Sequence, residues 1–186
     1  MGLFNDDFGR AYFGVTRWNS DGRIFGEFLY RLSHLGSNRT VLEHPLGALL
    51  CLPLMLAGGL FNALIINTKS IAWPGVLAIL LFGQPYFLEN LSYSFDAPLM
   101  VLAVDMCLFA SWLCTLSSRK IYPLIAGTLV TLSLLIYQPA NNAFWIPATL
   151  LLISRIGASR NKQNYASSNY NSVSYTHLTL PTSHNV

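Results

Sequence analysis

Charge is scarce in this sequence, and its scarcity excludes most classes of soluble protein. Only 10% of the 186 residues are charged and 53% are hydrophobic, whereas about a quarter of the residues in a typical soluble domain are charged. The net charge of +3 is too small and too scattered to indicate a nucleic-acid partner. The composition therefore predicts an integral membrane protein, in which the distribution of charge among the loops matters more than its sum.

Cysteine and histidine are also few, which disfavours disulfide scaffolds and metal centres. The three cysteines lie in apolar stretches, where we expect small buried side chains: Cys51, Cys107 and Cys114. His34 and His44 have neither a cysteine nor a second histidine at metal-ligand spacing, so a metal site is unsupported. The sequence has no glycine-rich phosphate loop, nucleophile elbow or dinucleotide fingerprint, which disfavours a soluble nucleotide-sugar enzyme.

Long apolar stretches are what the sequence has in abundance. A helix needs about 20 residues to cross about 30 Å of hydrocarbon, and five stretches approach that length, the last two being short. They are residues 46–67, 71–88, 97–116, 121–137 and 140–153. Gly58, Gly59 and Gly127 are placed to let neighbouring helices approach closely. The predicted fold is all-α, a polytopic membrane protein with about five transmembrane helices.

Basic residues in the connectors predict the orientation, because Lys and Arg stay on the cytoplasmic side of short loops. They occur in alternate connectors, at Lys69, at residues 119–120 and at residues 155–162. The intervening connectors, residues 84–96 and 138–142, contain no Lys or Arg. We therefore expect the opening segment and these two connectors to share the outer face.

These observations divide the chain into four segments. Residues 1–45 form an outer loop that carries an amphipathic helix, and residues 46–155 form the transmembrane region. Residues 156–172 form a polar cytoplasmic segment. The final stretch, which contains VSYTHLTLPT, is similar to the translation of a transposon-end sequencing adapter, so we expect residues 173–186 to be non-native.

The segment IFGEFLYRLSHL at Ile24–Leu35 predicts an amphipathic helix. Its apolar residues recur at helical spacing, whereas Glu27 and Arg31 form an i,i+4 pair on the other side. Two placements are open. The helix lies in the membrane interface, or it is an ordinary helix packed on its neighbours, and either one would hold the preceding loop over the membrane.

The opening segment NDDFGRAYFGVTRWNSDGR concentrates acids and arginines in front of the apolar stretches. Its candidate residues are Asp6, Asp7, Arg10, Trp18, Asp21 and Arg23. A carboxylate beside an acceptor hydroxyl can act as a general base, and guanidinium groups match phosphate oxygens in a bidentate geometry. The combination suits transfer from a phosphate-activated donor, although adjacent acids in a loop are more often simply solvated.

A second group of candidates lies in FLENLSYSFDAPLMVLAVD, which begins at Phe87. We expect Glu89 and Asp96 at the outer surface, facing the opening segment, and Tyr93 and Phe95 could present aromatic faces to a sugar ring. The alternatives are that interface aromatics only anchor the helix ends and that Asp96 caps the helix that follows it.

Asp105 lies about two turns inside the third apolar stretch. A carboxylate within a span costs about 2.5–3.5 kcal/mol on insertion scales, so it is expected to face a partner or a water-filled cavity. Two interpretations are open. Asp105 relays protons, which favours a transporter or flippase, or it forms a structural hydrogen bond with a group such as Thr115 or Ser133.

The opening segment, followed by HPLG and the first apolar stretch, resembles the start of the bacterial O-antigen glucosyltransferase II family. That family's first outer loop carries an Asp-Asp-x-x-Arg element and then a Trp and Gly-Arg element, and NLSYSFDAPLMVLA is similar to its second-loop pattern. The resemblance covers Leu3–Arg155. It implies a multi-pass GT-C type glycosyltransferase of the bacterial inner membrane, which moves glucose from a polyprenyl-phosphate donor to lipid-linked O-antigen polysaccharide on the periplasmic side.

The resemblance also implies roles for single residues. Asp6 and Asp7 map onto acids that act as general base or orient the acceptor in an inverting transfer, and Arg10 and Arg23 map onto positions that hold the donor phosphate. Substrate binding is expected at Trp18, Glu89, Tyr93 and Asp96. No cofactor is implied, and the participation of a divalent ion is left open.

The sequence departs from that family at both ends. Family members carry a membrane helix before the Asp-Asp loop and many more spans after the fifth, so the chain is interpreted as truncated. An inactive gene fragment is therefore a third interpretation, beside the enzyme and the transporter or flippase.

Overall fold

The computed structural model describes residues 10, 12–14, 18–36, 45–93, 95–116 and 121–178, with side chains described as far as residue 160. Within these ranges all regular secondary structure is helical, which confirms the all-α class. The chain divides into two units, Met1–Pro147 and Ala148–Val186. Every described candidate site residue belongs to the first unit.

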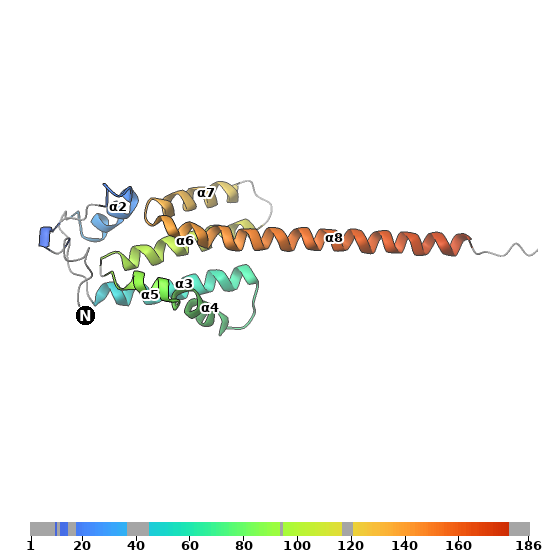
Figure 1. Ribbon diagram of the computed structural model, residues 1–186, viewed down its shortest axis with the longest axis horizontal. Coiled ribbons are helices and arrows are strands. Elements are labelled where there is room, and N and C mark those ends of the chain that lie inside the picture. The colour runs from blue at the N-terminus through green and yellow to red at the C-terminus, as the bar shows by residue number, and fades with distance from the viewer. Residues whose placement is uncertain are drawn as a thin grey trace, which may run out of the picture. The chain divides into compact units, whose positions relative to one another are not determined.

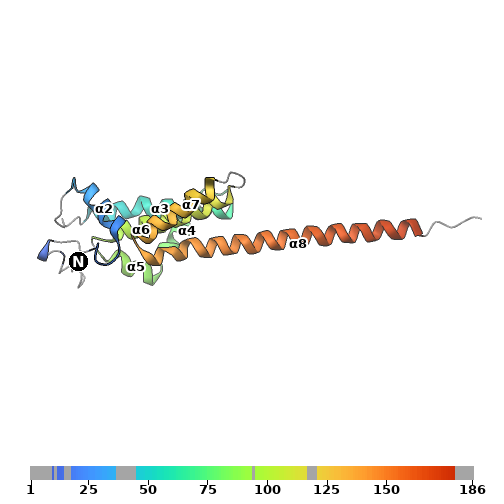
Figure 2. The same cartoon turned by 90° about the horizontal axis from the view of Figure 1, so that it is seen from above.

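The helices of the first unit pack around one central helix. In chain order the elements are α2 (Ile24–Ser33), α3 (Leu46–Ile66), α4 (Trp73–Phe82), α5 (Pro85–Leu91), α6 (Ala97–Thr115), α7 (Ile121–Leu134), the 3₁₀ helix η1 (Gln138–Asn141) and α8 (Asn142–Leu178). α6 lies between α3 and α7 and contacts both, while α4 packs on α3 (Figure 1). Seen from above, the axes of α3, α6 and α7 are roughly aligned, and α7 runs back along α6 (Figure 2).

Two of the about five predicted spans are found. In the described part of the chain, only α3 with 21 residues and α6 with 19 are long and apolar enough to cross a membrane. The predicted span 71–88 is interrupted at Gly83–Gln84, where Gln84 is extended because a residue that precedes proline disfavours helix. The resulting 10-residue α4 and the 14-residue α7 are shorter than the about 20 residues that a span needs.

Glycines allow α3 to approach its neighbours closely. A Cβ atom at Gly59 would overlap the backbone of α4, and one at Gly58 would overlap the ring of Phe82 and the carboxylate of Asp105. The predicted close approach is confirmed at these two positions. It is wrong at Gly127, where an added Cβ would meet no described atom within 4 Å.

Serine hydroxyls tie α6 to the helices that follow it. Ser133 Oγ of α7 donates to the carbonyl oxygen of Ala103 at 2.9 Å, and Ser111 Oγ donates to the carbonyl oxygen of Phe144 at 3.1 Å. Such bonds satisfy polar groups in an apolar interior. The prediction of buried cysteines is confirmed for Cys51 and Cys107 and is wrong for Cys114, which is exposed.

α2 confirms the predicted amphipathic helix, and its exposure favours one of the two placements. Its acid Glu27 is buried, whereas three apolar residues are more than half exposed. They are Ile24 (59%), Phe28 (57%) and Leu32 (63%). An ordinary packed helix would bury that face. α2 instead turns Glu27 to the protein and exposes Ile24, Phe28 and Leu32, and an exposed apolar face is typical of a helix in a membrane interface.

Candidate functional site

Asp96 joins two segments that are far apart in the sequence. Its Oδ2 lies 2.9 Å from Arg10 Nη1 and accepts a hydrogen bond from Arg23 Nη1 at 3.2 Å. The side chain of Asp96 is 6% exposed, that of Arg10 14% and that of Arg23 29%. We call these three residues the ion cluster. It lies where α6 begins, at the same end of the first unit as α2 (Figure 1).

The ion cluster decides between the two interpretations of Asp96. Asp96 occupies the N-cap position of α6, but its side chain makes no capping hydrogen bond, so the alternative of a helix cap is wrong. The carboxylate is directed to the guanidinium groups instead, in charge-assisted contacts that are stronger than neutral ones. The prediction that Asp96 faces the opening segment is confirmed.

A tight turn positions Trp18 and Arg23. The carbonyl oxygen of Trp18 accepts hydrogen bonds from the backbone N–H groups of Asp21 at 3.1 Å and Arg23 at 2.9 Å. Gly22 has φ +75°, a left-handed conformation that glycine adopts without a steric penalty. The turn is bound to α2 because the N–H of Asn19 donates to Glu27 Oε2 at 2.9 Å. The buried acid of α2 thus holds the loop in place.

Aromatic rings pack against the ion cluster. The guanidinium carbon of Arg10 lies 5.3 Å from the centre of the Trp18 ring, within cation–π range. Trp18 is 1% exposed and packs edge-on against Tyr30 of α2. Phe95 joins this cluster at 2% exposed, so the expectation that it presents a face to a sugar is wrong. For Trp18 the substrate contact stays a prediction. In the structure its ring packs against the guanidinium group of Arg10 and supports it.

Tyr137 connects the ion cluster to the two connectors that lack basic residues. Arg23 Cζ lies 5.9 Å from the centre of the Tyr137 ring, and the hydroxyl of Tyr137 accepts a hydrogen bond from Asn90 Nδ2 at 2.8 Å. The opening segment and both connectors that lack basic residues therefore meet, as predicted. The side of the membrane on which they lie stays a prediction. Sequence reasoning missed Tyr137 and Asn90, although both lie in or beside the connectors that it placed outside.

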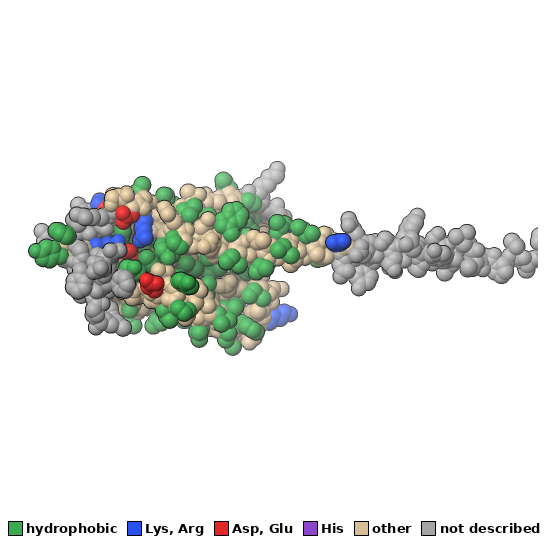
Figure 3. Space-filling view, in the orientation of Figure 1, with side chains coloured by type: hydrophobic (Ala, Val, Ile, Leu, Met, Phe, Trp, Pro, Cys, Tyr) green, Lys and Arg blue, Asp and Glu red, His purple; other side chains and the backbone are tan. Residues whose placement is uncertain are grey.

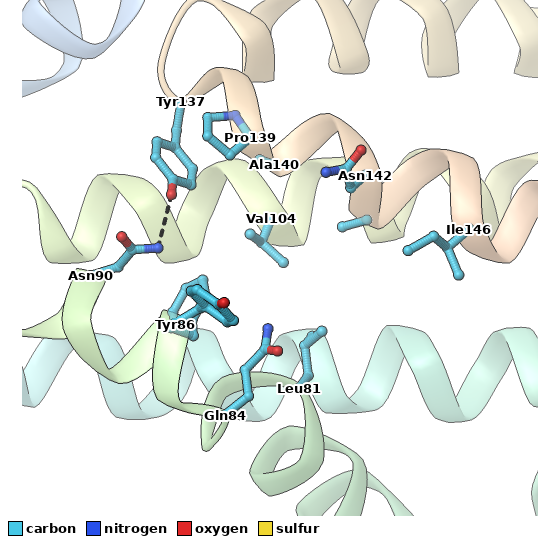
Figure 4. A pocket seen from close by; sticks show the side chains of 12 residues that line it. Leu81, Gln84, Tyr86, Asn90, Val104, Tyr137, Pro139, Ala140, Asn142 and Ile146 are labelled. Carbon is cyan, nitrogen blue, oxygen red and sulfur yellow. Dashed lines mark hydrogen bonds between the residues drawn. The ribbon is translucent and has the colours of Figure 1, made fainter.

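A cavity of about 300 Å³ adjoins the contact between Asn90 and Tyr137 (Figure 4). Residues of α4, α5, α6, η1 and the first turns of α8 line it, and none of those described is charged. Its polar lining residues are Gln84, Tyr86, Asn90, Tyr137 and Asn142. A second space of about 10 Å³ lies beside Arg23 and Asp96, which is room for about one water molecule.

Comparison with known proteins identifies the family of this chain. Residues 3–180 match the model of the family described as glucosyl transferase GtrII. The chain belongs to this family. The family assignment confirms the resemblance and supports glycosyl transfer as the class of activity.

A relative of this GtrII family member is longer than the chain. The chain is 28% identical over 183 residues to a Salmonella phage P22 protein described as "Uncharacterized 55.3 kDa protein in gtrB 5′region". The match covers 92% of this chain and 35% of that protein, so the chain spans about a third of its relative's length. No solved structure matches the chain.

Glu89 and Tyr93, the remaining described site residues, lie outside the ion cluster. Asp6 and Asp7 lie outside the described residues. Glu89 is exposed on α5, and Tyr93 is half-buried in the connector that follows. Among the residues that the structure describes, no group of three His, Cys, Asp or Glu side chains is placed to hold a metal ion.

Asp105 is buried in the middle of α6 at 4% exposed. Neither of its carboxylate oxygens has a hydrogen-bond partner among the described residues. Thr115 and Ser133 donate to backbone carbonyl oxygens instead, so the expectation that they pair with Asp105 is wrong. Asp105 lines neither of the two cavities above, and no described contact connects it to a proton path.

Proposed function

We propose that this chain is part of a membrane glucosyltransferase that moves glucose from a polyprenyl-phosphate donor to lipid-linked O-antigen on the periplasmic side of the bacterial inner membrane. Membership of the GtrII family supports glucosyl transfer. The observation that carries the choice of donor is the ion cluster, in which Arg10 and Arg23 converge on Asp96.

The ion cluster is suited to receive the phosphate of the donor. A guanidinium group has five N–H donors in a fixed plane, and Arg23 uses Nη1 for Asp96 while 29% of its side chain stays exposed. The space of about 10 Å³ beside Arg23 and Asp96 is too small for a phosphate. The phosphate therefore approaches from the exposed side of Arg23, where charge-assisted hydrogen bonds hold it.

Preplaced guanidinium groups also assist the chemical step. When the bond between the sugar and the lipid phosphate breaks, negative charge develops on the departing phosphate, and fixed donors stabilise that charge without reorganisation. We assign the removal of the acceptor hydroxyl proton to Asp6 or Asp7. The hydroxyl oxygen then attacks the anomeric carbon from the face opposite the phosphate, which inverts its configuration.

Exposed apolar surface supports a membrane location. Only 22% of the most apolar stretch of α3 is buried, and its exposed leucines are Leu46, Leu49, Leu50, Leu52, Leu56, Leu60 and Leu64. Soluble monomers rarely expose contiguous apolar patches larger than a few hundred Å². In Figure 3 hydrophobic side chains cover much of the helical surface, whereas acidic and basic side chains gather mainly near α2.

Donor binding and glucose transfer by the chain in lipid nanodiscs test the proposal. We expect the double variant Arg10→Gln, Arg23→Gln to bind labelled polyprenyl-phosphate glucose at least ten-fold more weakly, since charged hydrogen bonds contribute about 1.5–3 kcal/mol each. Arg155→Gln, in the second unit, is the matched control and should bind normally. A wild-type chain that does not bind this lipid would refute the proposed donor.

The proposed base has a separate readout. The double variant Asp6→Asn, Asp7→Asn should bind the donor normally and lose transfer to lipid-linked O-antigen, because only the proton acceptor is removed. Unchanged transfer would refute the assignment of the base. Cysteine introduced at Phe8 should react with a membrane-impermeant reagent from the periplasm, and reaction from the cytoplasm alone would refute the proposed orientation.

A further inference from the structure

The lining of the 300 Å³ cavity suits a neutral ligand that carries several hydroxyl groups. Three carboxamides and two phenols line it: Gln84, Asn90, Asn142, Tyr86 and Tyr137. A carboxamide both donates and accepts hydrogen bonds, as a sugar hydroxyl does. Apart from the bond between Asn90 and Tyr137, a hydrocarbon chain in this cavity would offer these groups no hydrogen-bond partner, which is unfavourable. A phosphate is unsuited as well, because no charged side chain is among the described residues that line the cavity.

The cavity has the volume for one ring. Its volume of about 300 Å³ is at the lower end of the range of about 300–1,000 Å³ for small-molecule sites, which favours a monosaccharide over an oligosaccharide. In Figure 4 the amide of Gln84 and the hydroxyl of Tyr137 point from opposite sides into the space between α5 and η1. Phe87 and Tyr86 add aromatic surface to the lining, against which the C–H face of a sugar ring can pack.

Tyr137 places this cavity next to the ion cluster. One face of its ring lies 5.9 Å from Arg23 Cζ, and its hydroxyl lies 2.8 Å from Asn90 Nδ2 in the cavity wall. In a glycosyl phosphate a single oxygen atom joins the sugar ring to phosphorus. The sites for sugar and phosphate must therefore be adjacent, and the contact between Arg23 and Tyr137 meets that requirement.

We propose that the cavity between α5, α6 and η1 binds the hexose ring of the phosphate-linked donor, with Asn90, Tyr137, Gln84 and Asn142 as partners of its hydroxyl groups. This inference rests on the proposed function and deepens it. The ion cluster recognises the phosphate, and the cavity recognises the sugar. Sugar specificity then depends on carboxamide and phenol groups that the ion cluster does not contain.

Comparing the binding of two lipids separates the contribution of the cavity from that of the ion cluster. The chain in nanodiscs is titrated with polyprenyl-phosphate glucose and with polyprenyl phosphate, which has the same lipid and phosphate but no sugar. The wild-type chain should prefer the sugar-bearing lipid. Tyr137→Phe and Asn90→Ala should each weaken binding of that lipid about ten-fold and leave binding of polyprenyl phosphate unchanged. Tyr122→Phe and Asn62→Ala, which remove the same groups outside the cavity, should change neither affinity.

The outcomes separate this inference from the proposed function. A wild-type chain that binds neither lipid would refute both. A wild-type chain that binds both lipids equally would refute the cavity assignment and keep the ion cluster. Equal weakening of both lipids by Tyr137→Phe and Asn90→Ala would show a structural role only and refute the assignment. Tyr137→Phe and Asn90→Ala variants that bind lipid-linked O-antigen more weakly but bind the donor normally would place the acceptor's sugar in the cavity. That result would overturn the assignment to the donor.

Discussion

Asp96 and Asp105 are both 4% exposed and both belong to the region of α6, yet their surroundings are opposite. Asp96 contacts two arginines from a distant segment. Asp105 lies against Gly58 of α3 and has no hydrogen-bond partner among the described residues. The comparison teaches that burial alone does not give an acid charged partners, and the proposed phosphate site rests on the convergence of opposite charges from separate segments.

Removing the carboxylate of Asp96 is expected to have the largest effect. Asp96→Ala leaves two partly buried guanidinium groups without their shared acceptor, and removing one partner of a buried pair costs about 3–5 kcal/mol. Because Arg23 is 29% exposed, we expect about 3 kcal/mol of lost stability in detergent, measured by denaturant titration. Asp21→Ala removes an exposed acid of the same turn and serves as control. Equal losses in the two variants would contradict the special position of Asp96.

Gly58→Ala tests how tightly Asp105 is enclosed. The added methyl group would overlap the carboxylate of Asp105 and the ring of Phe82, and overpacking costs about 1–3 kcal/mol. Gly127→Ala is the matched control, because its methyl group meets no described atom within 4 Å and alanine favours helix over glycine by about 1 kcal/mol. The two variants should therefore shift the free energy of unfolding in opposite directions, and a stabilising Gly58→Ala would contradict the packing.

Arg31→Gln measures a weaker ion pair at the same end of the molecule. Arg31 contacts Glu27 within α2, but its side chain is 44% exposed, and i,i+4 pairs on a helix surface contribute about 0.3–0.5 kcal/mol. Glu27 keeps its hydrogen bond from the N–H of Asn19. We expect about 0.5 kcal/mol of lost stability, against no change for Lys69→Gln. A loss of stability as large as that of Asp96→Ala would contradict the expected difference between the Arg31–Glu27 pair and the ion cluster.

Asp105→Asn should have the smallest effect. No hydrogen bond within the described residues is lost, and asparagine has nearly the same volume as aspartate, so we expect a change of less than about 0.5 kcal/mol. Asp96→Asn, measured alongside, should be clearly destabilising because an amide cannot replace the charge between two guanidinium groups. A large loss at Asp105 would reveal a partner that the described residues do not contain.

The sequence was sufficient for the helical class, for α2, and for the meeting of Asp96 with the opening segment. Those features depend on local periodicity and on charge distribution among connectors, which are readable along the chain. The sequence was insufficient for the predicted span at residues 71–88. The apolar run contains a break in the helix, and its only sequence signal is the Gln84–Pro85 pair. It also missed Tyr137, whose role depends on a contact with Arg23 that spans most of the first unit's sequence.

Residues that share a motif need not share an environment, which is a second limit of sequence reasoning. Trp18 was expected near a substrate because of its place in the family motif and Phe95 because of its aromatic ring, yet the structure buries both together with Tyr30. Glu89 and Asp96 were grouped as outer acids, but only Asp96 enters an ion pair among the described residues. Side-chain burial depends on how helices pack, and one-dimensional spacing does not contain that information.

The outward apolar face of α2 has a consequence for the height of Arg23. Arg23 directly precedes α2 and is hydrogen bonded within the turn that Glu27 holds. In a bilayer the immersion of Phe28 and Leu32 among the acyl chains fixes how deep α2 sits, and with it the level of the neighbouring guanidinium group. Under the proposed function that level would be the one at which lipid headgroups carry their phosphates, so the donor's phosphate would meet Arg23 at the same height whatever the length of its tail.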